Sequence, residues 1–299
     1  MNRSCSVILS RSIVFLLLSC ASFAAADEPV DSRQLNLSLL EAARAGDAAA
    51  VERLLQKGAS VKARNRTGAT PLIQAARGGH TQIVRTLLGA GADVDQANLE
   101  RATPLLEATR NGHLETATAL IQGGADVNRI DRQLLSPLMH AVYGGHTPLV
   151  RLLLEHGAMA GLVDRTGKSA LVYSAASGNT EILGLILARG VDVNERFGNE
   201  LTALMWAAGY GHVAAIGMLL DAGARMDLRD KRGMTALMIA SDQGHAAAVS
   251  KLVESGANRS LKDHGGKTAR DHAAAGGYTA VVELLPFTES RQSANSDRR

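Results

Sequence analysis

The chain has 299 residues, of which 46% are hydrophobic, 20% charged and 3% aromatic, and its formal net charge is +3. A nearly neutral chain with so few aromatic rings lacks the basic surface and the stacking platforms of nucleic-acid-binding proteins, so we expect no nucleic-acid partner. Its two cysteines, Cys5 and Cys20, both lie close to the N-terminus, which leaves the rest of the chain without disulfides, thiolate metal ligands or a cysteine nucleophile.

Residues 1–26 have the three parts of a secretory signal peptide. Arg3 and Arg11 are basic, an apolar run follows from Ile13 to Leu18, and three small residues end at Ala26. The apolar run is too short to span a bilayer. We predict cleavage after Ala26 and export to the periplasm of a Gram-negative bacterium, which lowers the net charge to +1 because both arginines are removed.

A second interpretation of this segment remains open. Leu17-Leu18-Ser19-Cys20 is similar to the cleavage box of bacterial lipoproteins, and cleavage there would make Cys20 a lipid anchor in the outer membrane. Secretion out of the cell is a further alternative. Periplasmic and secreted forms would share one mature chain, whereas a lipoprotein would start at Cys20.

Two series of glycines recur through the rest of the chain with a period of 33 residues. The first series is Gly46, Gly79, Gly112, Gly145, Gly178, Gly211, Gly244 and Gly277. The second lies twelve residues later and is Gly58, Gly91, Gly124, Gly157, Gly190, Gly223 and Gly256. Such a period predicts one supersecondary unit stacked many times, with each unit burying its apolar face on its neighbours.

The signals within one unit predict two helices. Thr70-Pro71 places a hydroxyl acceptor before a proline that pre-sets the first helical turn, and Gly78-Gly79 ends that helix. The second helix carries apolar pairs one turn apart, Ile83-Val84 and Leu87-Leu88, and closes at Gly91, where a left-handed backbone is expected.

The unit from Asn65 to Ala97, NRTGATPLIQAARGGHTQIVRTLLGAGADVDQA, resembles the ankyrin repeat. The resemblance implies an all-α solenoid of helix-turn-helix units with short β-hairpin fingers, in one domain over residues 32–289. A polar tail, 290–299, is expected to be disordered. The eight repeats implied by it begin near Ser32, Asn65, Asn98, Asp131, Asp164, Phe197, Asp230 and Asp263.

Several positions depart from the family pattern. Arg101, Leu134 and Glu200 replace the turn glycine of their units, so the geometry of these finger tips is the least well predicted. In the last unit Asp271 replaces an apolar residue of the inner helix, which is typical of a capping repeat that keeps the final apolar face out of water.

Recurring polar residues have structural interpretations. The histidines that follow the first glycine series occupy the start of each second helix, and we interpret them as turn and cap residues, since units about 10 Å apart cannot converge on one metal ion. The aspartates at the base of the fingers, Asp131, Asp164, Asp230 and Asp263, are expected to accept backbone N–H bonds in a tight turn.

Aromatic and basic residues that break the period are the candidate binding site. Four aromatic residues gather on the inner helices of the central units: Tyr143, Tyr173, Trp206 and Tyr210. Such rings anchor protein interfaces, although filling gaps in the packing is an equally open explanation. Basic residues crowd the finger tips and suggest an acidic partner: Arg132, Arg165, Lys168, Arg196, Arg229, Lys231 and Arg232.

The sequence therefore predicts a non-catalytic, monomeric protein-interaction scaffold that binds a protein through its concave face. No His-Glu-x-x-His or Gly-x-Ser-x-Gly motif occurs, and we expect neither a cofactor nor a bound metal. Two alternatives stay open: an exported carrier of haem or metal that uses His113, His140 and His146, and a host-directed effector that uses the same groove.

Overall fold

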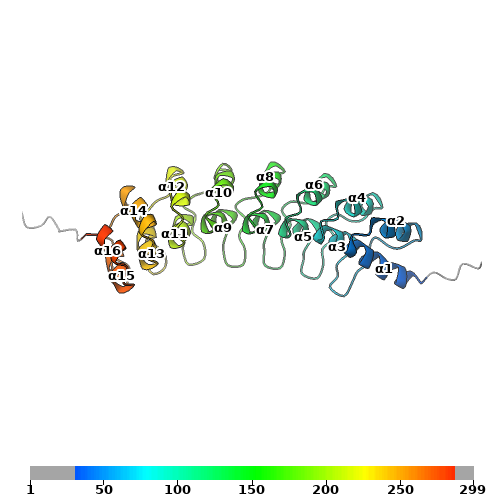
Figure 1. Ribbon diagram of the computed structural model, residues 1–299, viewed down its shortest axis with the longest axis horizontal. Coiled ribbons are helices and arrows are strands. Elements are labelled where there is room, and N and C mark those ends of the chain that lie inside the picture. Colours follow the sequence, from blue (N-terminus) through cyan, green and yellow to red (C-terminus); the bar gives the residue numbers. More distant parts are fainter. Residues whose placement is uncertain (1–30, 287–299) are drawn as a thin grey trace, which may run out of the picture.

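The computed structural model describes residues 31–286. The predicted signal peptide with Ala26 and Cys20, and the predicted tail 290–299, lie outside the described residues. The described chain forms a long, gently arched stack of helices in two rows, and loops called fingers here extend from the inner row on the side away from the outer row (Figure 1).

Helices alternate between the two rows along the chain. The inner row consists of α1 (Ser32–Ala45), α3 (Pro71–Arg77), α5 (Pro104–Arg110), α7 (Pro137–Tyr143), α9 (Ala170–Ser177), α11 (Ala203–Gly209), α13 (Ala236–Asp242) and α15 (Ala269–Ala275). The outer row consists of α2 (Ala48–Gln56), α4 (Thr81–Gly89), α6 (Leu114–Gln122), α8 (Thr147–Glu155), α10 (Thr180–Leu187), α12 (Val213–Asp221), α14 (Ala246–Glu254) and α16 (Thr279–Leu284). Each inner helix packs on the outer helix that follows it and, up to α13, on the next inner helix, as a stacked solenoid requires.

The inner helices begin where the sequence predicts. The Thr70 hydroxyl accepts a hydrogen bond from the Ile73 amide at 3.2 Å, and Pro71 occupies the first turn. Helix α9 is the exception, because Ser169 makes no capping bond and its hydroxyl is buried without a partner among the described residues. In the last unit Asp271 accepts from the Thr268 amide at 2.8 Å and closes a capping box at the start of α15, a role separate from the one predicted for it in a capping repeat.

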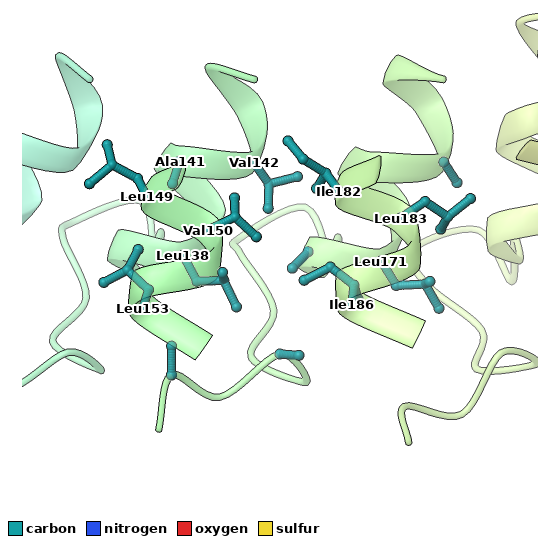
Figure 2. Packing of buried hydrophobic residues seen from close by; sticks show 14 of the residues in the cluster. Leu138, Ala141, Val142, Leu149, Val150, Leu153, Leu171, Ile182, Leu183 and Ile186 are labelled. Atoms are coloured by element: carbon teal, nitrogen blue, oxygen red, sulfur yellow. The ribbon is translucent and has the colours of Figure 1, made fainter. Parts of the chain in front are cut away.

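The core is continuous through the stack, within each unit and between successive units. Leu138, Val142 and Val150 from α7 and α8 face Ile182 and Ile186 from α10, and these five side chains are at most 1% exposed (Figure 2). Truncating such a leucine to alanine typically costs about 2–5 kcal/mol. Since each interface joins two units, the loss of one buried side chain weakens the contact between neighbours.

The fingers are tight turns. The Asp131 carboxylate accepts from the amides of Gln133 and Leu135 at 2.8 and 3.0 Å, which confirms the turn role predicted for the aspartates. Two isolated β-bridges, Val163–Ser169 and Phe197–Leu201, are the extent of strand pairing in residues 31–286, so the hairpin character of the fingers is slight.

The finger tips without glycine keep the conformation of those that have it. Arg101, Leu134 and Glu200 have φ values of 59°, 62° and 64°, in the left-handed region that favours glycine. Neighbouring fingers are also linked by backbone bonds, such as the one from the Arg132 amide to the Glu100 carbonyl at 3.1 Å. We infer that the ladder between fingers holds these tips in a conformation that their own residues disfavour.

The periodic histidines differ from their predicted role. His80 makes no capping bond to its own helix; its Nε2 instead lies 3.2 Å from the Arg44 carbonyl of the preceding unit. His212 has the same relation to Ala176, at 3.0 Å. A Cβ added to Gly178 would lie 2.6 Å from the His212 ring, so this glycine is required both by its positive φ and by the close approach of the ring; Gly145 and Gly277 of the same series have no such neighbour.

Candidate functional site

The predicted aromatic residues lie on one face of the inner row, in the middle of the stack. Tyr143 ends α7, Tyr173 lies in α9, Trp206 lies in α11 and Tyr210 directly follows α11. Tyr143 is 78% exposed and Tyr210 is 55% exposed, whereas Tyr173 and Trp206 are partly buried. Lys168, from the finger before α9, joins them.

These five residues line a shallow cavity of about 310 Å³, which we call the aromatic hollow. Its remaining lining residues are Val172, Ala176 and Ser177. Tyr143 and Tyr173 meet edge to face with ring centroids 5.8 Å apart, and Trp206 and Tyr210 stack at 6.1 Å. The Lys168 ammonium lies 4.8 Å from the Trp206 ring centroid, a cation–π contact.

The repeat explains why the hollow forms here. Positions 33 residues apart are equivalent, and the position held by Arg77, Arg110 and Tyr143 is held by Ala176 and Gly209 in the next two units. Small side chains at these two positions leave space beside rings that neighbouring units carry. The change from large to small residues at this position can be read from the sequence, whereas the aromatic rings alone do not indicate it.

A second cavity of about 270 Å³, the second hollow, adjoins the first. Trp206 and Tyr210 line both, so the stacked pair forms the wall between them. Met205, Ile239 and Arg232 contribute to the far side of the second hollow. The two hollows together extend across the inner face of four successive units, from α7 to α13.

A hydrogen bond fixes Tyr173 within the hollow. Its hydroxyl donates to the Asp164 carboxylate, which also accepts from the Thr166 and Lys168 amides at 2.8 and 2.9 Å. Burial disfavours the charged form of both groups. The pKa of Tyr173 is raised by burial and by Asp164, whereas burial of Asp164 is outweighed by its hydrogen bonds, which lower its pKa. Asp164 is thus a charged positioning residue that the sequence interpretation treated as a turn residue alone.

Trp206 lacks a hydrogen-bond partner nine residues earlier in the chain, which the equivalent residues His140 and Tyr173 have. Asp131 lies nine residues before His140 and bonds to it at 2.9 Å, as Asp164 does to Tyr173. The equivalent residue before Trp206 is Phe197, which is buried and offers no acceptor. The buried Trp206 Nε1 accordingly has no hydrogen-bond partner among the described residues. Since Trp206 is partly buried and also lines both hollows, packing and binding are not separate alternatives for this residue.

Most of the predicted basic residues are not at the aromatic hollow. Arg132, Arg196 and Arg232 pair with acidic neighbours, namely Glu100 at 3.8 Å, Glu200 at 2.6 Å and Asp230 at 2.8 Å. Arg196, Arg229 and Lys231 line a separate finger hollow of about 440 Å³ with His264, Glu200 and Asp230. Arg165 lies on the same finger as Lys168 and is exposed. The predicted basic edge is therefore a surface of mixed charge in which only Lys168 and Arg232 reach the two hollows.

The inner face before the hollow carries buried charge that the sequence interpretation missed. The Glu107 side chain is 3% exposed and accepts from Arg77 Nε and Nη2 at 3.1 and 2.9 Å. Arg110 bonds to Asp131 at 3.1 Å, and Asp131 bonds to His140. The pKa of His140 is lowered, first by burial and then by Arg110, although Asp131 acts in the opposite direction.

The three histidines of the carrier hypothesis have separate partners. His113 Nε2 lies 3.0 Å from the Arg77 carbonyl, His140 is held by Asp131, and the His146 ring covers Gly112. Within residues 31–286 no group of three or more His, Cys, Asp or Glu side chains is arranged to hold a metal ion. The helices of the same range are all too short or too polar to cross a membrane.

Comparison with known proteins gives the family. A family model described as ankyrin repeats matches three stretches, residues 39–131, 130–197 and 204–295, whereas a search of curated proteins returns no match. Ankyrin repeats are generally protein–protein interaction modules without catalytic activity. The matches cover most of the chain and agree with the stack of helix pairs. This chain belongs to the ankyrin-repeat family.

Proposed function

We propose that this protein is an exported, monomeric scaffold of eight ankyrin repeats that binds a protein partner at the aromatic hollow of its concave face. Each consecutive helix pair, from α1 and α2 to α15 and α16, is one repeat. The observation that carries the proposal is the exposure of Tyr143 and Tyr210 beside a hollow that small residues leave open.

Energetics favour an interface at these rings. Large exposed aromatic side chains add little to folding, because water still covers them, yet each buries a large apolar area when a partner covers it. Tyrosine and tryptophan are enriched among the residues that dominate binding energy. Substitution of Tyr143 or Tyr210 should therefore weaken binding much more than it lowers stability.

Alanine substitution at the two exposed rings tests the proposal. Tyr143→Ala and Tyr210→Ala should each leave thermal unfolding nearly unchanged while weakening partner binding by about 2 kcal/mol, or about thirtyfold. Met159→Ala is the matched control, since Met159 is 58% exposed in the loop after α8. Equal partner capture by all three variants from the periplasmic fraction of the native organism would reject the aromatic hollow as the site.

Export is proposed from the N-terminal segment. Mass spectrometry of the mature protein should find a chain that starts at Asp27, directly after the three small residues. A chain that starts at a lipid-modified Cys20 would place the same scaffold on a membrane surface. An intact Met1 would contradict export.

A further inference from the structure

The aromatic hollow already holds a cation of this chain. Lys168 Nζ lies 4.8 Å from the Trp206 ring centroid and 5.9 Å from that of Tyr173. Aromatic faces arranged in this way commonly receive an ammonium group of a ligand. Here a ligand ammonium would meet a like charge a few ångströms away, so the hollow disfavours a cationic ligand.

The cation in the hollow lacks an anion. Among the ion pairs of residues 31–286, none includes Lys168. The carboxylate closest in sequence, Asp164, is engaged elsewhere: Oδ1 accepts from two backbone amides and the Thr166 hydroxyl, and Oδ2 accepts from Tyr173. Lys168 therefore keeps its hydrogen-bonding capacity for a group outside the described chain.

Two further basic residues of the fingers are also unpaired within the described chain. Arg165, on the same finger, and Lys231, on the finger two units later, are exposed and belong to none of these ion pairs. The paired arginines, by contrast, have their acidic partners on the same or the neighbouring finger. Within the mixed charge of the fingers, Arg165 and Lys231 are thus two further cations that no acidic side chain of residues 31–286 pairs with.

We propose that the aromatic hollow binds an acidic peptide segment of the partner. A carboxylate of the segment pairs with Lys168, and an adjacent apolar side chain packs against Trp206 and Tyr210 in the second hollow. Neighbouring inner helices are about 10 Å apart, which about three residues of extended chain span. This inference rests on the proposed function and adds the chemical class of the bound segment.

Selection from a phage-displayed random peptide library tests the inference without knowledge of the partner. The purified protein is compared with Lys168→Met, which removes the charge and keeps an apolar stem, and with Lys168→Glu, which reverses it. Lys57→Met on the first repeat is the matched control, because Lys57 is exposed and distant from the hollow. Tyr210→Ala reports whether selected peptides bind at the hollow at all.

We expect selected peptides to pair Asp or Glu with a nearby apolar or aromatic residue. Their affinity should fall about tenfold or more on Lys168→Met, and should be unchanged on Lys57→Met. Lys168→Glu should select basic residues instead. Binding is read from Trp206 fluorescence, because this is the single tryptophan of the chain, and an unchanged unfolding midpoint shows that each variant is folded.

Two results would overturn the inference and can be told apart. Peptides that lose affinity on Tyr210→Ala but are neutral or basic, and unaffected by Lys168→Met, would reject the acidic segment and keep the hollow as a binding site. Peptides unaffected by Tyr210→Ala, a failure to select any peptide, or self-association of the protein through this face would reject both.

Discussion

Glycines of the first series that lie against a ring of the next unit should tolerate alanine less well than glycines of the second series, although all have a positive φ. Gly190 has a φ of 70° and nothing within 4 Å of an added Cβ. Gly190→Ala should therefore cost only the left-handed backbone, about 1 kcal/mol of the free energy of unfolding. Gly178 has nearly the same φ, 69°, but its added Cβ would lie 2.6 Å from His212 Nδ1.

The clash adds a second loss at Gly178. The His212 ring must move, which breaks its 3.0 Å hydrogen bond to the Ala176 carbonyl and costs about 1 kcal/mol more, together with lost packing between units. We therefore expect Gly178→Ala to cost about 2–4 kcal/mol in urea unfolding. In His212→Ala the extra cost should disappear, because the obstructing ring is gone. Equal losses at Gly178 and Gly190, or additive losses with His212→Ala, would refute the reasoning.

Three further predictions concern the interfaces between repeats. Arg77→Met should lower the free energy of unfolding by about 3 kcal/mol, because the buried Glu107 loses its bidentate partner. Adding Glu107→Leu should restore much of this loss. Urea unfolding of the single and double variants that shows no coupling between the two positions would contradict this. Since the pKa of His140 is lowered in the folded state, stability should be full above about pH 6.5, the unfolded value, and fall on acidification; His140→Gln should flatten that dependence of the melting temperature. Ala207→Leu should cost about 1–3 kcal/mol through overpacking at a fully buried position, and an unchanged melting profile would mean that the unit geometry is misassigned.

The repeat architecture could be predicted because its signals are local and recur. Thr70-Pro71 fixes a helix start within four residues, and Asp131 closes its own finger through bonds to residues two and four positions later. Interactions of this range can be inferred from one sequence. The 33-residue period then places equivalent residues side by side, which put Tyr173 and Trp206 on one surface.

Contacts between repeats were harder to predict. The sequence predicts that His212 caps the helix that directly follows it, whereas its hydrogen-bond partner, Ala176, lies 36 residues earlier. The pairing of Arg196 with Glu200 likewise depends on side-chain conformations at a finger tip. The two hollows lie where Ala176 and Gly209 replace larger residues, a signal that appears only when equivalent positions of the repeats are compared. Charge counts along the fingers therefore overestimated the basic surface available to a partner.

Site-specific photocrosslinking in the native organism tests the central claim most directly. A photoreactive phenylalanine analogue replaces Tyr210 in one strain and Met159, exposed in the loop after α8, in another. The account predicts a discrete crosslinked partner from position 210, lost when Tyr143→Ala is added, and none from position 159. A partner crosslinked from position 159 but not from position 210 would contradict binding at the aromatic hollow.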